Sequence, residues 1–121
     1  MARGETKVVL YEKPTCSTCR QVKRALTEKG VEINCVNYME NPLSAKELKE
    51  LLKQARLKPQ DALRTKEAAY REHVAGKNLT DDELIRVMVE HIELLQRPIV
   101  VRGNKAVLAR PVDKLAELNL K

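Results

Sequence analysis

The feature that most restricts the fold is an apolar segment that leads through two cysteines into an amphipathic one. Residues 7–12 contain the apolar run Val8–Leu10 and are followed by Pro14, Cys16 and Cys19. A strand that passes into a helix here places Cys16 at the first turn of that helix. Unpaired backbone N–H groups and the positive end of the helix dipole favour a thiolate there. Since a thiolate is a nucleophile, the sequence predicts an enzyme whose reactive group is Cys16.

The first part of the chain predicts a strand, a helix and a second strand with short connections. The periodicity places them at residues 7–12, 17–29 and 32–38, with Gly30 ending the helix. Such a unit pairs its strands in parallel through a crossover that is almost always right-handed. We expect the second strand to be buried beside the first, which makes Cys35 a core residue rather than a third redox partner.

The middle of the chain is predicted to be helical. Ser44 and Thr80 each open a capping box that is followed by an apolar stripe. A shorter helical segment over residues 66–74 lies between these two helices. The stripes consist of Leu48, Leu51, Leu52 and Ala55 in the first helix, and of Leu84, Ile85, Met88, Ile92 and Leu95 in the second.

The last part of the chain predicts a hairpin and a closing helix. Strands over residues 99–101 and 106–109 flank a tight turn at Gly103 and Asn104. Pro111 suits the first turn of a helix that places Val112, Leu115 and Leu118 on one face.

The complete order is β-α-β, then helices, then β-β-α. This is the element order of the thioredoxin-like fold, with a helical insert between the second and third strands. We therefore expect an α/β protein in which residues 1–121 form a single thioredoxin-like domain and the insert covers about residues 43–96.

Three roles are open to a lone C-x-x-C pair. A zinc site needs two further ligands at close spacing, and His73 and His91 are isolated on predicted helices. Two small residues could instead fill the start of a helix. The strand-to-helix setting favours redox or nucleophilic chemistry, in which Cys19 could resolve a mixed disulfide on Cys16. We expect neither a metal nor another bound cofactor.

The predicted start of the helix also offers hydrogen-bond donors to an anion. Ser17 and Thr18 have hydroxyl and backbone N–H groups that could cradle an anion beside the sulfur, or could simply cap the helix. The net charge of +6, from 23 Lys and Arg against 17 Asp and Glu, suits phosphates, small oxyanions or an acidic protein.

Other binding partners and locations are disfavoured. The basic residues are scattered among acidic ones, and Tyr11, Tyr38 and Tyr70 are too far apart to form a stacking platform, so we do not expect direct nucleic-acid binding. No apolar run suits a signal peptide or a membrane span. Three cysteines without a secretory signal favour a cytoplasmic protein with reduced thiols.

Three arginines are candidates for binding an oxyanion. Arg97 and Arg110 each precede a proline, and Arg64 lies in the predicted insert. Guanidinium forks bind tetrahedral oxyanions through paired hydrogen bonds, although each arginine taken singly is better explained as a surface residue. Thioredoxin-like folds place a cis-proline before the third strand, facing the nucleophilic cysteine. A cis bond at Pro98 would hold Arg97 toward the site.

Six stretches carry a resemblance to a known family. They are Leu10-Tyr11-x-x-Pro14-x-Cys16-x-Thr18-x-Arg20, Tyr38-x-Glu40-Asn41-Pro42, Leu63-Arg64-x-Lys66-x-x-x-Tyr70, Leu79-Thr80-Asp81-Asp82-x-Leu84-Ile85, Arg97-Pro98-Ile99-Val100-Val101 and Arg110-Pro111. Over nearly its whole length the chain resembles the glutaredoxin-linked arsenate reductases of the ArsC type and their relatives. The resemblance implies Cys16 as the catalytic cysteine and arginines 64, 97 and 110 as the oxyanion ligands, with Arg20 and Pro98 in support.

The resemblance also implies a reaction and its partners. The thiolate of Cys16 attacks arsenate, glutathione then releases arsenite, and glutaredoxin or thioredoxin clears the cysteine. In the best-known enzymes of this type a His stands where this chain has Glu12, and a Ser stands where it has Cys19. A carboxylate at position 12 is expected to raise the pKa of Cys16 unless Lys13 or Arg20 neutralises it.

Two other functions remain open. A general thiol–disulfide reductase would use the pair Cys16 and Cys19 and would not need Arg64. The second alternative is similar to the related Spx-type regulators, in which a C-x-x-C switch changes contact with RNA polymerase. That reading implies the α subunit of the polymerase as the partner. Fold alone does not separate these functions, because function depends on the site.

Overall fold

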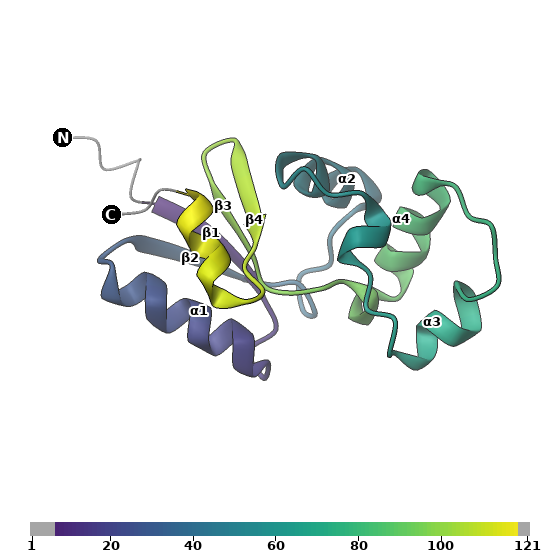
Figure 1. Cartoon of the computed structure of the whole chain (residues 1–121), viewed down its shortest axis with the longest axis horizontal. Helices are drawn as coiled ribbons and strands as arrows, with labels where there is room; N and C mark the ends of the chain where they lie inside the picture. The colour runs from purple at the N-terminus through teal and green to yellow at the C-terminus, as the bar shows by residue number, and fades with distance from the viewer. Residues whose placement is uncertain (1–6, 119–121) are drawn as a thin grey trace. The chain divides into compact units, whose positions relative to one another are not determined.

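The computed structural model describes residues 7–118 and divides the chain into two compact units (Figure 1). Unit 1 contains the described residues up to Asn41 and those from Arg97 onward, and unit 2 contains Pro42–Gln96. That the two units work as a single domain stays a prediction.

Unit 1 is a four-stranded mixed sheet with helices. The strand order is β2-β1-β3-β4; β2 runs parallel to β1, whereas β3 is antiparallel to both β1 and β4. The elements are β1 (Lys7–Glu12), α1 (Ser17–Glu28), β2 (Glu32–Asn37), β3 (Ile99–Arg102), β4 (Lys105–Leu108) and the 3₁₀ helix η4 (Val112–Leu118). The predicted β-α-β and β-β-α halves are therefore confirmed.

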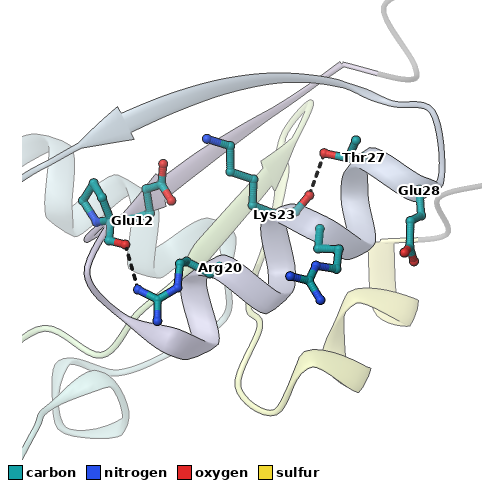
Figure 2. A pocket seen from close by; sticks show the side chains of 7 residues that line it. Glu12, Arg20, Lys23, Thr27 and Glu28 are labelled. Atoms are coloured by element: carbon teal, nitrogen blue, oxygen red, sulfur yellow. Dashed lines mark hydrogen bonds between the residues drawn. The ribbon is translucent and has the colours of Figure 1, made fainter.

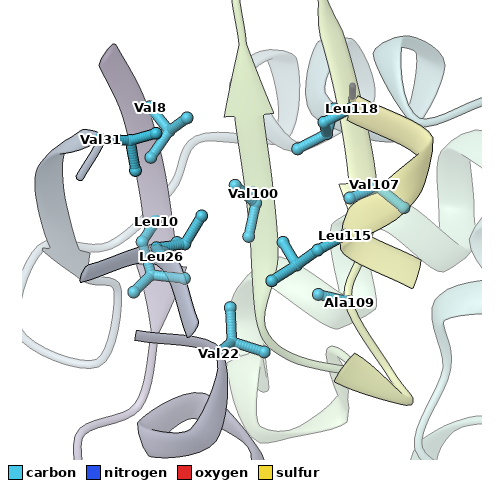
Figure 3. Close-up of a cluster of buried hydrophobic side chains, with 10 residues drawn as sticks. All are labelled: Val8, Leu10, Val22, Leu26, Val31, Val100, Val107, Ala109, Leu115 and Leu118. Atoms are coloured by element: carbon cyan, nitrogen blue, oxygen red, sulfur yellow. The ribbon is translucent and has the colours of Figure 1, made fainter. Parts of the chain in front are cut away.

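The core of unit 1 joins one face of the sheet to α1 and η4, as Figure 3 shows. Alternate side chains of a strand point to opposite faces, so Val8 and Leu10 of β1 reach the same layer. The buried cluster contains Val8, Leu10, Val22, Leu26, Val31, Val100, Val107, Ala109, Leu115 and Leu118. This packing fixes the end of β1 against the start of α1, where the two cysteines lie.

The prediction that the second strand is buried was wrong. β2 is an edge strand that pairs only with β1, and Cys35 on it is exposed. The strand also ends at Asn37, one residue earlier than expected. Backbone N–H groups of Glu40 and Asn41 both donate to the carbonyl oxygen of Asn37, at 3.1 and 2.9 Å, and turn the chain. Tyr38 consequently lies in the turn, where it is buried.

Two cis peptide bonds are present in unit 1, at Arg97–Pro98 and Arg110–Pro111. The first is the cis-proline expected before the third strand. The hairpin turn is also as predicted, with Gly103 at a φ of 62°, a conformation that favours glycine. The closing helix is a 3₁₀ helix and begins at Val112.

Unit 2 is helical, as predicted. Both capping boxes are present. The side chains of Ser44 and Thr80 accept from the backbone N–H groups of Glu47 and Glu83, and the carboxylates of these two glutamates accept from the backbone N–H groups of Ser44 and Thr80. The elements are α2 (Ala45–Gln54), the 3₁₀ helix η2 (Pro59–Ala62), α3 (Ala68–His73), α4 (Asp81–Glu90) and the 3₁₀ helix η3 (Ile92–Leu94).

The two predicted apolar stripes are buried, apart from one member of each. Ala55 is only partly buried, and Ile92 lies in η3 with a partly buried side chain. His73 and His91 are not isolated, as the sequence indicated, because their rings stack with centroids 4.1 Å apart. Within residues 7–118, no helix combines the length and the apolar character that crossing a membrane requires.

Candidate functional site

Cys16 lies at the junction between β1 and α1. It is the N-cap of α1, directly before the helix start that the sequence indicated at residue 17, and its N–H donates to the carbonyl oxygen of Lys13 at 2.9 Å. The N–H of Cys19 points toward the sulfur of Cys16 without completing a capping hydrogen bond. The unpaired N–H groups at the start of α1 thus face a sulfur, where most helices have a hydroxyl or a carboxylate.

The thiol of Cys16 is acidic. Burial by itself would raise its pKa, but donors around the sulfur outweigh this effect and lower the pKa to about 7. The donors are the backbone N–H and the thiol of Cys19, together with the guanidinium of Arg97, which also contributes its charge. The lowered pKa therefore favours the thiolate of Cys16 at neutral pH.

Cys19 has the opposite character. It is fully buried, at 0% exposure, and burial together with the neighbouring sulfur of Cys16 raises its pKa to about 12. Cys19 thus stays a thiol and donates its proton toward Cys16. Neither cysteine is in a disulfide. A nucleophilic thiolate, Cys16, therefore lies beside a protonated thiol, Cys19, that could attack a mixed disulfide on it.

Arg97 is the cation of the site. Its side chain is 9% exposed, and its Nε has no hydrogen-bond partner in the described part of the chain. Burial would lower its pKa, but Tyr38 and the sulfur of Cys16 raise it overall, so the guanidinium stays charged. Pro98, in cis after it, is buried. Arg97 acts on Cys16 through its charge, and its role as an oxyanion ligand stays a prediction.

Two other predicted arginines are placed in unit 1 by backbone carbonyls. Nη1 of Arg110 donates to the carbonyl oxygen of Arg97 at 3.2 Å, which brings a second cation beside the first. Nη1 of Arg20 donates to the carbonyl oxygen of Pro14 at 3.3 Å and so braces the loop before Cys16. At the start of α1, Ser17 is exposed and Thr18 is half-buried.

Arg64 belongs to unit 2. Its Nε lies 3.2 Å from Oε2 of Glu67, and its N–H donates to the carbonyl oxygen of Leu94 at 2.7 Å. The structure thus gathers Cys16, Cys19, Arg97 and Arg110 in unit 1. A role for Arg64 in the same chemistry stays a prediction.

Tyr38 is the site residue that the sequence did not reveal. It is 1% exposed, and its hydroxyl has no hydrogen-bond partner among residues 7–118. Burial raises its pKa to about 12, and its interactions with Arg97, Cys19 and Cys16 place it beside the thiols. Only its place in the stretch Tyr38-x-Glu40-Asn41-Pro42 could have singled it out.

Glu12 is the last residue of β1 and lies beside α1. Its side chain is 5% exposed and lines a surface pocket along α1, together with Pro14, Arg20, Lys23, Arg24, Thr27 and Glu28 (Figure 2). After burial, Glu12 is the largest cause of a raised pKa at Cys35. The expected rise in the pKa of Cys16 is not found, since that pKa is lowered.

The chemistry of the site is that of a nucleophile beside an anion-binding group. A thiolate and a buried guanidinium with an unpaired donor can hold an anion and attack it. Across residues 7–118, no three His, Cys, Asp or Glu side chains gather into a set that could hold a metal ion.

Comparison with known proteins identifies relatives of this arrangement. The model of the ArsC family matches residues 11–118. The uncharacterized protein YfgD of Escherichia coli K12 is 37% identical over 93% of this chain and 96% of its own length. An arsenate reductase of Neisseria meningitidis is 31% identical over 90% of this chain and 95% of its own. The solved arsenate reductase from Vibrio cholerae superposes with a TM-score of 0.88 at 36% identity, covering 93% of this chain and 97% of that one.

Proposed function

Since the chain belongs to the ArsC family, we propose that it is a thiol-dependent arsenate reductase whose nucleophile is Cys16. The observation that carries the proposal is the pairing of an acidic thiol, with a pKa of about 7, with a buried arginine whose Nε is unpaired. Relatives that share over 90% of their length with this chain are named arsenate reductases, which supports the same substrate here.

In the first step the thiolate of Cys16 attacks arsenic. A sulfur–arsenic bond forms, and one arsenate oxygen leaves as water after protonation. A thiolate and an arsenate anion repel each other, so the step needs a fixed positive charge at the arsenate oxygens. Arg97 supplies this charge, and Arg110 adds a second cation from its position beside the Arg97 backbone. The family resemblance implies Arg64 as a third oxyanion ligand.

In the second step another thiol attacks the sulfur of Cys16. A disulfide forms, the sulfur–arsenic bond breaks, and its electron pair stays on arsenic, which leaves as arsenite. The family resemblance implies glutathione as this thiol, with glutaredoxin or thioredoxin restoring Cys16. The neighbouring thiol of Cys19 is a second candidate for this role. The two electrons come from two thiols, so the reaction needs no bound cofactor but needs a reducing compartment such as the cytosol.

The test is arsenite production from arsenate with glutathione and glutaredoxin. We expect Cys16→Ser to abolish turnover and Arg97→Ala to lower kcat/KM by at least about a hundredfold, because a buried charge at the developing anion is lost. Arg64→Ala tests the third arginine, and Arg24→Ala, on the exposed side of α1, is the control. Retained turnover in Cys19→Ser would assign the second step to glutathione.

One observation also favours a second function, a general thiol–disulfide reductase. The acidic thiol of Cys16 beside the protonated thiol of Cys19 is the arrangement that such a reductase requires. This function predicts disulfide reduction that needs Cys19 and tolerates loss of Arg97. A polymerase-binding redox switch also stays a prediction, which would show oxidation of the cysteine pair without turnover.

A further inference from the structure

Two buried polar atoms of unit 1 lack hydrogen-bond partners in the described chain, and they belong to neighbouring residues. They are the hydroxyl of Tyr38 and Nε of Arg97. Their side chains are 1% and 9% exposed, so bulk water does not satisfy them. A buried donor without a partner lowers the stability of the fold, so its presence in a native structure needs an explanation.

The two groups lie at the same place. Arg97 is close enough to Tyr38 for its charge to act on the phenol. The Tyr38 hydroxyl and Nε of Arg97 each lack a hydrogen-bond partner among residues 7–118. Both also interact electrostatically with Cys16. The unpaired donors are therefore next to the nucleophilic sulfur rather than at a remote structural position.

The chemistry of these donors selects an anion as their ligand. An arginine Nε–H can only donate a hydrogen bond, and a phenol donates while it keeps its proton. Burial holds Tyr38 in the protonated form, so its hydroxyl remains a donor throughout the neutral range. A ligand that satisfies both groups must present at least two acceptor atoms, as a tetrahedral oxyanion does.

We propose that Tyr38 is a substrate-binding residue, whose hydroxyl and the Nε of Arg97 donate to oxygens of the same bound oxyanion. This inference rests on the proposed function and adds a neutral donor to the arginines. A neutral donor adds affinity for the anion without raising the positive charge around Cys16. The hydroxyl contributes nothing when the substrate is a disulfide, so Tyr38 sets the preference for oxyanions over disulfides.

The test compares Tyr38→Phe, which keeps the buried ring and removes only the hydroxyl, with the wild type. For arsenate we expect kcat/KM to fall by about tenfold or more, the effect of losing a hydrogen bond to a charged group. Calorimetry with arsenate on the Cys16→Ser background isolates binding, and adding Tyr38→Phe there should raise the Kd by a similar factor. Tyr70→Phe, which removes a hydroxyl from α3, is the matched control.

Two further readouts separate a binding role from a structural one. Reduction of a small disulfide by Tyr38→Phe should stay within about twofold of the wild type, and the ligand-free variant should melt at the wild-type temperature or above, because an unpaired hydroxyl is removed. Equal losses with arsenate and with the disulfide, together with a lower melting temperature, would show that the hydroxyl is structural and overturn the inference.

The remaining outcomes distinguish the inference from the proposed function. If the wild type reduces arsenate and Tyr38→Phe does so equally well, the inference fails and the proposed function stands. If the wild type makes no arsenite and Cys16→Ser binds no arsenate, the proposed function fails and the role of Tyr38 falls with it.

Discussion

The reactivity of Cys16 depends on donors that outweigh the effect of its burial, namely the N–H and thiol of Cys19 and the guanidinium of Arg97. Arg97 donates to its sulfur and adds a positive charge, and the pKa of Cys16 is about 7 in spite of burial. We predict that Arg97→Ala raises this pKa toward the ordinary value of 9.0. The rate of alkylation by iodoacetamide, followed against pH, reports the thiolate and should lose its midpoint near neutrality. An unchanged midpoint, with Arg24→Ala as the control, would contradict the account.

The sign of the accompanying stability change follows from the lowered pKa. The folded protein releases the Cys16 proton at a lower pH than the unfolded chain does, so the stabilisation is present above the unfolded pKa. It is lost as the pH falls through about 7. The unfolding free energy of the wild type relative to Cys16→Ser should therefore rise between about pH 7 and pH 9. A difference that is flat or falls across this window would count against a lowered pKa.

The thiol of Cys19 contributes a hydrogen bond to the same thiolate. We predict that Cys19→Ala raises the pKa of Cys16 more than Cys19→Ser does, because serine keeps an O–H donor at this buried position. Both variants remove the second sulfur, so any difference between them measures the hydrogen bond. Equal alkylation profiles for the two variants would show that the thiol proton does not act on Cys16.

Residue type and order were enough to name several residues of the candidate site. Cys16, Cys19, Arg97, Pro98 and Arg110 were all candidates, and the structure places them in unit 1. Tyr38 was not among the candidates, because its burial depends on the turn that the Asn37 carbonyl makes after β2. The burial of Glu12 beside α1 likewise depends on packing, which residue type does not reveal.

At the scale of elements, the two capping boxes give the clearest prediction. Ser44 and Thr80 are exposed, so replacing them loses the cap and little packing. Ser44→Ala and Thr80→Ala should each lower the unfolding free energy by about 1 kcal/mol. Denaturant unfolding measures this change. Ser17→Ala is the control, because α1 begins without a completed side-chain cap. A cost no larger than that of the control would show that the boxes add nothing.

Local sequence patterns predicted the existence of the elements more accurately than their positions in the fold. The capping boxes, the Gly103 turn and the strand over residues 7–12 depend on neighbouring residues and are confirmed. Whether β2 lies at the centre or the edge of the sheet is decided by β3, which pairs with the other side of β1. Cys35 was accordingly expected to be buried and is exposed.

At the scale of the molecule, the core of unit 1 supports the site. Leu10 is fully buried in β1, one of the two central strands of the sheet, which leads into the Cys16 loop. Leu10→Ala should cost about 2–5 kcal/mol, as expected for a large side chain removed from a packed core. Chemical denaturation tests this. Met39→Ala, at an exposed position of the same unit, should stay within about 0.5 kcal/mol of the wild type. Comparable costs for the two variants would contradict the described packing.

The proposal that Cys16 and Arg97 together reduce arsenate is tested most directly by a single-turnover reaction. Reduced protein in excess over arsenate is mixed with glutathione and glutaredoxin, and the arsenite formed is measured over time. We expect complete conversion by the wild type, none by Cys16→Ser and a much slower reaction with Arg97→Ala. Arsenite formed at the same rate by the wild type and Cys16→Ser, or none formed by the wild type, would contradict it.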